Sequence, residues 1–250
     1  MRRLTLLIFA TLVVLPCRTG AQKVPQGAVD AGKKAFQIEI ERLRSKPESF
    51  RHSWNLPDYL EETSTLVLED PYVEFMMLED EVVDFANSNG LDIVSFGRAY
   101  SYGFAMTSNG RHIGTILVMH NMDGNGRKRV EDKPEWVTGA RRSAGDWLFE
   151  RITELRREYP VDQGFVISAL RTYGVGNYLV VRQKGVTMRI TPGDRVAAKT
   201  LRQEGRLDRG DYPVIDYGEA LPLLREQAVE QARWLEQRRN QVQPDSGGQR

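Results

Sequence analysis

The sequence predicts an α+β protein in which antiparallel β-hairpins are covered by amphipathic helices. Apolar residues recur at helical spacing in four segments of the chain, and between these segments the spacing changes to the alternation of strands. The pair Asn109-Gly110 is a preferred hairpin turn, because both residue types tolerate a positive φ angle. Helices and hairpins in this arrangement are typical of helices packed on an antiparallel sheet.

The N-terminal segment has the organisation of a secretory signal peptide, residues 1–21. Two arginines precede an apolar core of twelve residues, 4–15, and the small residues Thr19, Gly20 and Ala21 follow it. The apolar core is shorter than the roughly 20 residues of a membrane-spanning helix. We therefore expect cleavage after Ala21 and a secreted or periplasmic protein, with an uncleaved anchor as the alternative.

The single cysteine, Cys17, lies inside this leader. A lipid-anchoring cysteine requires a small residue before it, and Pro16 stands there, which argues against a lipoprotein. Once the leader is removed, the chain contains no cysteine and is therefore disulfide-free. Core burial alone must then stabilise an exported protein.

The mature chain is long enough for one large domain and carries little net charge. Cleavage leaves 229 residues (250 − 21) and, without the three arginines of the leader, 32 basic against 34 acidic side chains. Nucleic acids and anionic membranes select a marked basic excess, so neither is an expected partner. We expect residues 22–240 to form a single α+β domain, without a transmembrane segment after removal of the signal.

The first helix is predicted over 29–43. Its apolar residues share one face: Val29, Phe36, Ile40 and Leu43. Residues 22–26 precede it as a linker, and Pro47 disfavours helix in the residue before it. A short strand is predicted at 64–68.

A second helix is predicted from Asp70-Pro71 to Ala86, because aspartate is a good N-cap and proline suits the first helical position. Its apolar face is formed by Phe75, Leu78, Val82, Phe85 and Ala86. The sequence Asn-Ser-Asn-Gly at 87–90 ends this helix, and a strand is predicted at 91–95.

The hairpin at Asn109 joins predicted strands at 100–107 and 112–120. The most regular helical pattern follows at 139–159 and ends before Pro160. Its apolar residues recur at intervals of three and four: Ala144, Leu148, Ile152 and Leu155.

The C-terminal part of the chain continues the alternation of strands and helices. The predicted elements are strands at 164–170, 177–182 and 186–191, one short helix within 195–210, and a long helix at 218–239. The remaining residues, 241–250, are polar and are predicted to form a disordered tail.

Two sections of the chain, 70–120 and 141–191, each predict a helix, a strand and a hairpin, which suggests an internal repeat. The segments that begin at Arg98 and Arg171 both read R-x-Y-[SG]-x-G and lie 73 residues apart (171 − 98). Coincidence between two similar hairpins is the alternative, because tyrosine and glycine are common at strands and their corners.

Asn121 opens a stretch with the spacing of a calcium-binding loop. Oxygen-bearing side chains occupy positions one, three, five and twelve: Asn121, Asp123, Asn125 and Asp132. Three cations, Arg127, Lys128 and Arg129, stand inside this loop and oppose a bound cation. A strand precedes it, where the calcium motif has a helix. The stretch is therefore interpreted as a polar turn, with the four oxygen-bearing residues as the alternative metal ligands and no metal expected.

Histidine chemistry is the other catalytic candidate. His112 and His120 would lie roughly 26 Å apart on one regular strand, too far to share a metal ion. His120 with Asp123 suggests a general base and its orienting carboxylate, although a histidine that bonds a nearby turn is the more common arrangement. No serine elbow, phosphate-binding loop or zinc motif occurs in the sequence.

Tyrosines and arginines at the starts of the two related segments are the candidate ligand-binding residues. Tyr100, Tyr102 and Phe104 alternate along one strand, and Tyr173 occupies the related segment. Such a row binds a sugar or a peptide when it is open, and it forms core when helices cover it, which is the favoured interpretation. Arg98 and Arg171 head the two segments and are suited to clamp an anionic group.

These observations favour a non-catalytic binding or protein-interaction module that is exported and needs no cofactor. Its ligand is an unidentified protein or small molecule. The alternative is an exported hydrolase that uses His120 with a nearby carboxylate. The C-terminal helix, in which Trp234 broadens the apolar surface beside Leu235, is a candidate oligomerisation element.

Overall fold

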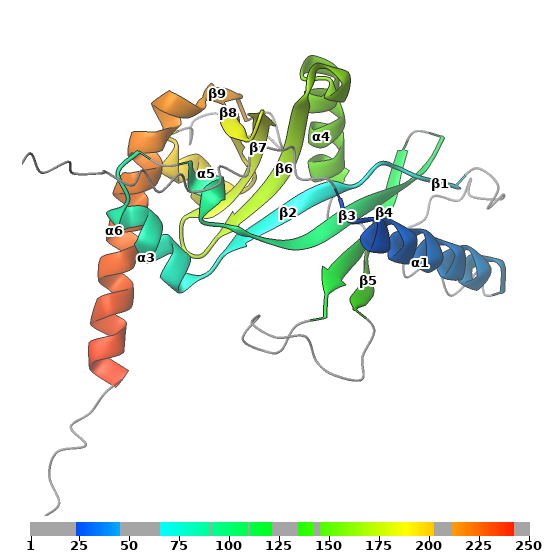
Figure 1. Ribbon diagram of the computed structural model, residues 1–250, viewed down its shortest axis with the longest axis horizontal. Coiled ribbons are helices and arrows are strands. Elements are labelled where there is room, and N and C mark those ends of the chain that lie inside the picture. Colours follow the sequence, from blue (N-terminus) through cyan, green and yellow to red (C-terminus); the bar gives the residue numbers. More distant parts are fainter. Residues whose placement is uncertain are drawn as a thin grey trace, which may run out of the picture.

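The computed structural model describes residues 24–45, 66–90, 92–109, 111–121, 135–142, 146–202 and 212–242 (Figure 1). The helices are α1 (Gln26–Ser45), α3 (Glu79–Asn87), α4 (Asp146–Glu158), α5 (Arg195–Thr200) and α6 (Tyr217–Val242), with 3₁₀ turns η2 (Ile93–Ser95) and η3 (Val161–Gln163). The strands are β1 (Leu66–Leu68), β2 (Tyr72–Met77), β3 (Arg98–Ser108), β4 (Arg111–His120), β5 (Trp136–Arg142), β6 (Phe165–Thr172), β7 (Gly176–Gln183), β8 (Val186–Pro192) and β9 (Ile215–Asp216). The protein is therefore α+β.

The strands form one mostly antiparallel sheet in the order β5-β4-β3-β2-β6-β7-β8-β9, and β1 adds to β3. At its centre β2 and β6 run parallel to each other, with Val73 opposite Ser168 and Met77 opposite Thr172. From this pair one antiparallel meander leads outward to β5 and the other leads outward to β9. The carboxyl ends of β2 and β6 consequently lie side by side in the middle of the sheet (Figure 1).

The hairpin turns have the backbone geometry that their residues favour. Asn109 joins β3 to β4 with a φ of 50°, as the Asn-Gly pair predicts. Lys184 and Gly185 join β7 to β8 with φ angles of 51° and 84°. Both predicted hairpins are thus confirmed.

Alternation along the strands sends side chains to two separate cores, one on each face of the sheet. Val73 and Phe75 of β2 join the larger core, which also contains Phe36 of α1, Phe85 of α3 and Leu224 of α6. The larger core lies on the face shared by α1, α3, α5 and α6. The smaller core, on the opposite face, contains Tyr72, Ile152, Leu155, Ile167, Ala169, Leu179 and Val181, and α4 contributes two of these residues.

Three predicted elements are wrong. Residues 72–77 form β2 and not the first half of a helix, because Tyr-Val-Glu-Phe-Met-Met is buried on both faces of the sheet and so lacks alternation. Residues 139–142 belong to β5, and the helix predicted from Gly139 begins only at Asp146. The strand predicted at 91–95 is the turn η2, which Asp92 caps by accepting a hydrogen bond from the amide of Val94 at 3.0 Å.

The first and last predicted helices agree with α1 and α6, and the short helix predicted after 195 is α5. The predicted tail begins at Gln241, but α6 continues to Val242, and the rest of the tail lies outside the described residues. The predicted signal peptide, Cys17 included, also lies outside them. No helix in the described part of the chain is long and apolar enough to cross a bilayer.

The matching segments at Arg98 and Arg171 occupy different positions in their hairpins. Arg98 opens β3, whereas Arg171 is the last residue but one of β6, so that its segment continues through the turn into β7. The first section also places its helix, α3, after its first strand, while α4 precedes β6.

Candidate functional site

The carboxyl end of β2 brings the two predicted arginines to the same level of the sheet. Met76 is the register partner of Arg98 on β3 and of Arg171 on β6. The backbones of the two arginines are therefore about 10 Å apart, two strand spacings of about 4.8 Å. We call Arg98, Met76 and Arg171 the arginine row.

Arg171 contacts a carboxylate at the centre of the sheet. Its Nη2 lies 3.3 Å from Oε2 and 3.4 Å from Oε1 of Glu74, whose side chain is fully buried, while the side chain of Arg171 is 31% exposed. Ser101 Oγ donates to Glu74 Oε2 at 2.8 Å, and the Tyr72 hydroxyl donates to Oε1 at 3.3 Å. A buried carboxylate is tolerated only with such partners, so this cluster holds Arg171 in place.

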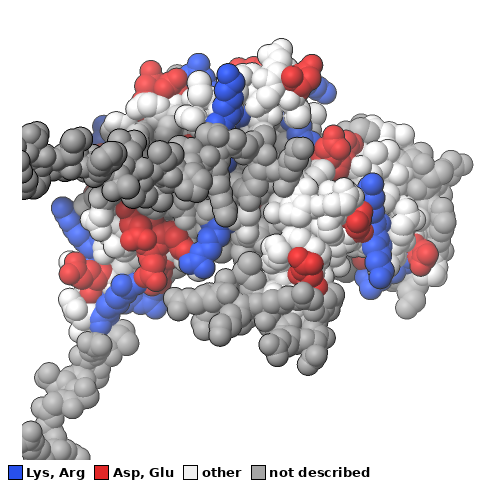
Figure 2. All heavy atoms as spheres, in the orientation of Figure 1, with Lys and Arg blue, Asp and Glu red and all other residues white. Residues whose placement is uncertain are grey.

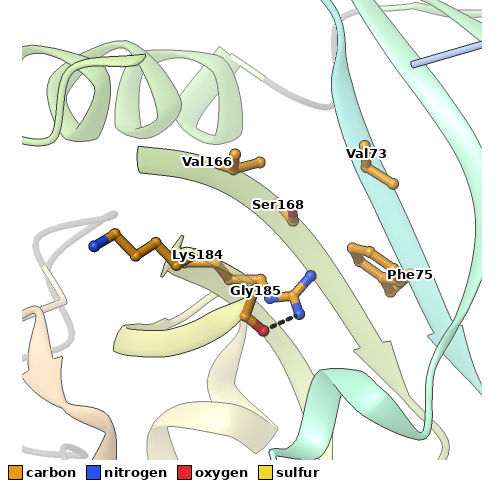
Figure 3. A pocket seen from close by; sticks show the side chains of 7 residues that line it. Val73, Phe75, Val166, Ser168, Lys184 and Gly185 are labelled. Carbon is orange, nitrogen blue, oxygen red and sulfur yellow. Dashed lines mark hydrogen bonds between the residues drawn. The ribbon is translucent and has the colours of Figure 1, made fainter. Parts of the chain in front are cut away.

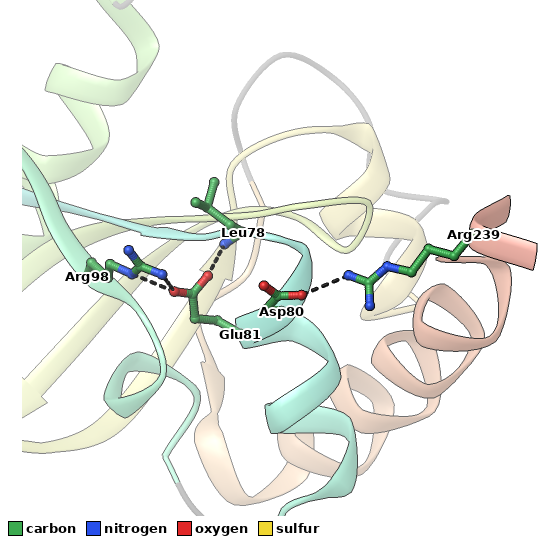
Figure 4. A network of polar contacts seen from close by, with 5 residues as sticks. All are labelled: Leu78, Asp80, Glu81, Arg98 and Arg239. Atoms are coloured by element: carbon green, nitrogen blue, oxygen red, sulfur yellow. Dashed lines mark hydrogen bonds and ion pairs between the residues drawn. The ribbon is translucent and has the colours of Figure 1, made fainter. Parts of the chain in front are cut away.

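Arg98 contacts a carboxylate at the surface (Figure 4). Its Nε donates to Glu81 Oε1 at 2.5 Å, and its Nη2 forms an ion pair with the same oxygen. The other oxygen of Glu81 accepts the amide of Leu78 at 2.9 Å, which caps the N-terminus of α3. The acidic first turn of α3 is favourable beside the helix dipole, and it fixes the position of Arg98.

Asp80, which precedes Glu81 in α3, connects the same region to α6. Arg239 Nη2 donates to Asp80 Oδ1 at 2.7 Å (Figure 4). In the space-filling view, acidic and basic side chains alternate where α3 meets α6 (Figure 2). The end of β2, the start of α3 and the C-terminal half of α6 therefore form one connected surface.

Two of the predicted tyrosines are exposed beside the arginine row. Tyr100 is 43% exposed on β3, and Tyr173, which is 38% exposed, donates its amide to the carbonyl of Met77 at 3.1 Å. The hydroxyl of Tyr173 also accepts a hydrogen bond from Arg238 Nη1 at 3.4 Å. Both tyrosines therefore remain accessible to a ligand at the end of β2.

Tyr102 and Phe104 are placed differently from Tyr100. Both are buried in the larger core, and the ring of Tyr102 meets that of Trp136 edge to face at 5.9 Å. Burial raises the pKa of the Tyr102 hydroxyl. Tyr178 is also buried, and its hydroxyl donates to the carbonyl of Val175 at 2.8 Å. For Tyr102 and Phe104 this is the core placement that the sequence favours, whereas Tyr100 of the same row is exposed.

The predicted histidine and metal residues are only partly described. The His120 ring lies against Trp136 with centroids 3.9 Å apart, and the buried Asn121 donates its amide to the carbonyl of Glu135 at 2.9 Å. Asp123, Asn125 and Asp132 lie outside the described residues. His112 Nε2 lies 2.9 Å from Thr115 Oγ1. Within the described residues, no three His, Cys, Asp or Glu side chains are grouped as metal ligands.

Sequence reasoning missed Glu74 and Ser101. The sequence predicts a helix around Glu74, and an acidic residue among apolar ones is common in an amphipathic helix. The available signal was the run Tyr-Val-Glu-Phe-Met-Met itself, because an acidic residue inside an apolar strand requires a partner on a neighbouring strand. That partner is Arg171, which the sequence indicates only through the segment that it shares with Arg98.

Chemically, the arginine row can bind an anion. A guanidinium carries five N–H donors, and Arg171 contacts Glu74 through Nη2. Arg98 uses Nε and Nη2 for Glu81 and is 49% exposed. Donors on both side chains are thus available for a carboxylate, flanked by the exposed rings of Tyr100 and Tyr173.

No family model and no curated protein matches the sequence, and no solved structure matches the fold. The site is therefore interpreted from its own geometry.

Proposed function

We propose that the protein is an exported, non-catalytic binding module whose ligand presents an anionic group to the arginine row. The observation that supports this proposal is the register of the sheet, which sets Arg98 and Arg171 on either side of Met76. Each arginine is positioned by its own carboxylate, so both are ordered before a ligand arrives. Preorganised donors cost less conformational entropy on binding.

The exposed residues around the row suit an interaction surface. Tyrosine, tryptophan and arginine are the residue types that carry most of the energy of protein interfaces. Tyr100 and Tyr173 flank the row, and Trp234 on α6 is 46% exposed with the guanidinium of Arg238 5.4 Å from its ring. A protein or small molecule with a carboxylate for each arginine and one apolar group fits this chemistry.

The experiment is an NMR titration of the side-chain Nε–Hε signals of arginine with glutarate, a dicarboxylate probe. We expect the signals of Arg98 and Arg171 to shift together and to saturate with one affinity. Arg202, which pairs with Glu226 in the N-terminal half of α6, is the internal control, and its signal should not follow that binding curve. Equal small shifts of all arginines would show general salt binding and contradict the proposal.

Alanine variants of the two arginines extend the test to a natural ligand, once one is known. Replacing Arg98 and Arg171 by alanine should lower the affinity for that ligand. Circular dichroism should confirm that the variants remain folded. Unchanged affinity in folded variants would count against the site.

Export is the second part of the proposal. It is supported by the order of residue types in 1–21, where basic residues come first, an apolar core follows, and small residues precede the expected cleavage site. N-terminal sequencing of the protein from its native source should give Gln22 as the first residue. A mature chain that begins at Met1 would contradict it.

We also propose that residues 70–120 and 141–191 are two copies of one duplicated unit, and that amphipathic helices cover the sheet that they form. The two meanders that leave the parallel β2–β6 pair support this proposal, because β2, β3 and β4 lie in the first unit and β6, β7 and most of β8 lie in the second. The helices α1 and α4 pack on opposite faces of the sheet. Profiles of homologous sequences should align β2–β4 with β6–β8. Unrelated apolar positions in the two halves would contradict the duplication.

Two alternatives have their own tests. A hydrolase that uses His120 with Asp123 predicts turnover of a generic ester, peptide or glycan substrate that is lost in His120→Ala. Oligomerisation through α6 is favoured by the exposed Trp234 and predicts a larger sedimentation coefficient for the full chain than expected of a monomer, reduced by truncation at Asp216.

A further inference from the structure

A small cavity lies on the face of the sheet that carries the larger core, away from the arginine row. It is lined by Val73, Phe75, Val166, Ser168, Arg182, Lys184 and Gly185 (Figure 3). Its volume of about 10 Å³ has room for roughly one water molecule or an ion of similar size. The elements around it are β2, β6 and the β7–β8 hairpin.

Two buried polar atoms beside this cavity have no hydrogen-bond partner in the protein: Ser168 Oγ and Arg182 Nε, both in the described part of the chain. Ser168 is 1% exposed. A buried donor without an acceptor costs about 1–3 kcal/mol, and a charged donor costs more. Both atoms therefore require an acceptor that fits between the strands.

The guanidinium of Arg182 is held at the cavity by two contacts. Its Nη2 donates to the carbonyl of Gly185 at 2.6 Å, and its Cζ lies 5.7 Å from the centre of the Phe75 ring. Neither contact is with a carboxylate, and none of the described residues that line the cavity is acidic. The positively charged guanidinium of Arg182 thus contacts an aromatic ring and a carbonyl oxygen.

These observations favour an anion over a neutral water molecule as the occupant of the cavity. A water molecule would accept from Ser168 and Arg182 but would leave the charge of the guanidinium uncompensated. An anion accepts from both donors and also neutralises that charge, and charge-assisted hydrogen bonds are about twice as strong as neutral ones. Lys184 extends away from Ser168, so its ammonium adds only to the field at the rim (Figure 3).

We infer that Ser168 and Arg182 form a site for a small monovalent anion, a halide ion or the carboxylate end of a compact ligand. Ser168 Oγ and Arg182 Nε donate to the anion, and Phe75, Val73 and Val166 form the apolar wall around it. The site lies on the other face of the sheet from Glu74, so it is independent of the arginine row.

The most direct test is diffraction from crystals grown in sodium bromide. We expect an anomalous peak within hydrogen-bond distance of Ser168 Oγ and Arg182 Nε. Density without anomalous signal, as water gives, would overturn the inference.

Thermal unfolding in solution distinguishes the two sources of the anion. At constant ionic strength, sodium bromide, sodium formate and sodium gluconate are compared, the last being too large to enter. We expect bromide, formate or both to raise the midpoint by about 3–6 °C at about ten times the dissociation constant. A rise with bromide alone indicates a halide site, and a rise with formate indicates a carboxylate site. Equal midpoints in all three salts would contradict the inference.

Variants separate this site from general charge effects. Arg182→Gln should abolish the anion-dependent rise, and Ser168→Ala should weaken the affinity about tenfold through the loss of one hydrogen bond to a charged group. Arg202→Gln changes the charge equally at a surface ion pair and should retain the full rise. If Ser168→Ala and Arg202→Gln behave alike, Ser168 is not part of an anion site.

Discussion

Arg171 and Arg98 stand at the same level on either side of β2, yet their carboxylate partners differ in exposure. Glu74 is fully buried and also accepts hydrogen bonds from Ser101 and Tyr72, whereas Glu81 caps a helix at the surface. Removing one partner of a buried pair costs several kcal/mol, while surface pairs contribute about 0–1 kcal/mol. The Arg171–Glu74 pair is therefore needed for the stability of the fold, whereas the Arg98–Glu81 pair contributes little to stability.

The largest effect is expected for Arg171→Met. The change leaves the carboxylate of Glu74 without its cation, and we expect a loss of about 3 kcal/mol in the free energy of unfolding, measured by urea denaturation. The double variant Glu74→Leu with Arg171→Met removes both charges and should recover most of this loss. A single variant within about 0.5 kcal/mol of wild type would show that the cluster does not depend on Arg171.

Gly103→Ala tests the same cluster from the neighbouring strand. Gly103 lies opposite Tyr72, and a Cβ atom there would collide with the Tyr72 ring. We expect a loss of about 1–3 kcal/mol, because the ring must move away from Glu74. Gly139→Ala on β5, where no atom of the described residues lies within 4 Å of the added Cβ, is the matched control and should be nearly neutral.

A titration to high pH extends the comparison of buried and exposed polar groups to the larger core. Burial raises the pKa of the Tyr178 hydroxyl above its ordinary value of about 10. The unfolded chain therefore loses this proton first, so that stability is full below about pH 10 and falls as the pH rises above it. The expected slope is up to about 1.4 kcal/mol per pH unit for each such tyrosine.

Tyr178→Phe provides the check on this titration. The variant removes the titrating group, so its stability should fall less steeply than that of wild type between about pH 10 and 11. Urea denaturation across this range measures the difference. Equal slopes in the two proteins would show that Tyr178 ionises as readily in the folded protein as in the unfolded chain.

The smallest effect is expected for Arg98→Gln. Its partner Glu81 retains the amide of Leu78, and the Arg98 side chain is 49% exposed, so we expect a loss below about 1 kcal/mol. The loss should shrink further at high salt, because surface ion pairs are screened. A loss as large as that of Arg171→Met would erase the distinction between the two pairs.

The sequence predicted the parts of the fold and site that depend on local pattern. The hairpin at Asn109 and the helix α1 follow from turn chemistry and periodicity, and Arg98 and Arg171 were identified from a shared motif. What brings these arginines together is the parallel pairing of β2 with β6, a contact between residues 95 positions apart in register (168 − 73). No local pattern carries that information.

Two errors share one physical cause. At β2 the pair Asp70-Pro71 indicated a helix start, but the strand is buried on both faces, so burial and not alternation decided its structure. At Gly139 the helical pattern of α4 was extended backward into β5, an edge strand whose described residues Val137, Thr138 and Gly139 are exposed. Tertiary pairing overrode local propensity in both places.

The binding of one ligand by both arginines of the row is tested most directly by calorimetric titration with acetate and glutarate. Glutarate can reach both arginines, whereas acetate can occupy one, so the wild-type protein should bind glutarate at least about tenfold more tightly. Arg98→Gln, which is expected to remain folded, should reduce the affinity for glutarate to nearly that for acetate. Equal affinities for the two anions in the wild-type protein, or an unchanged ratio in the variant, would contradict a shared site.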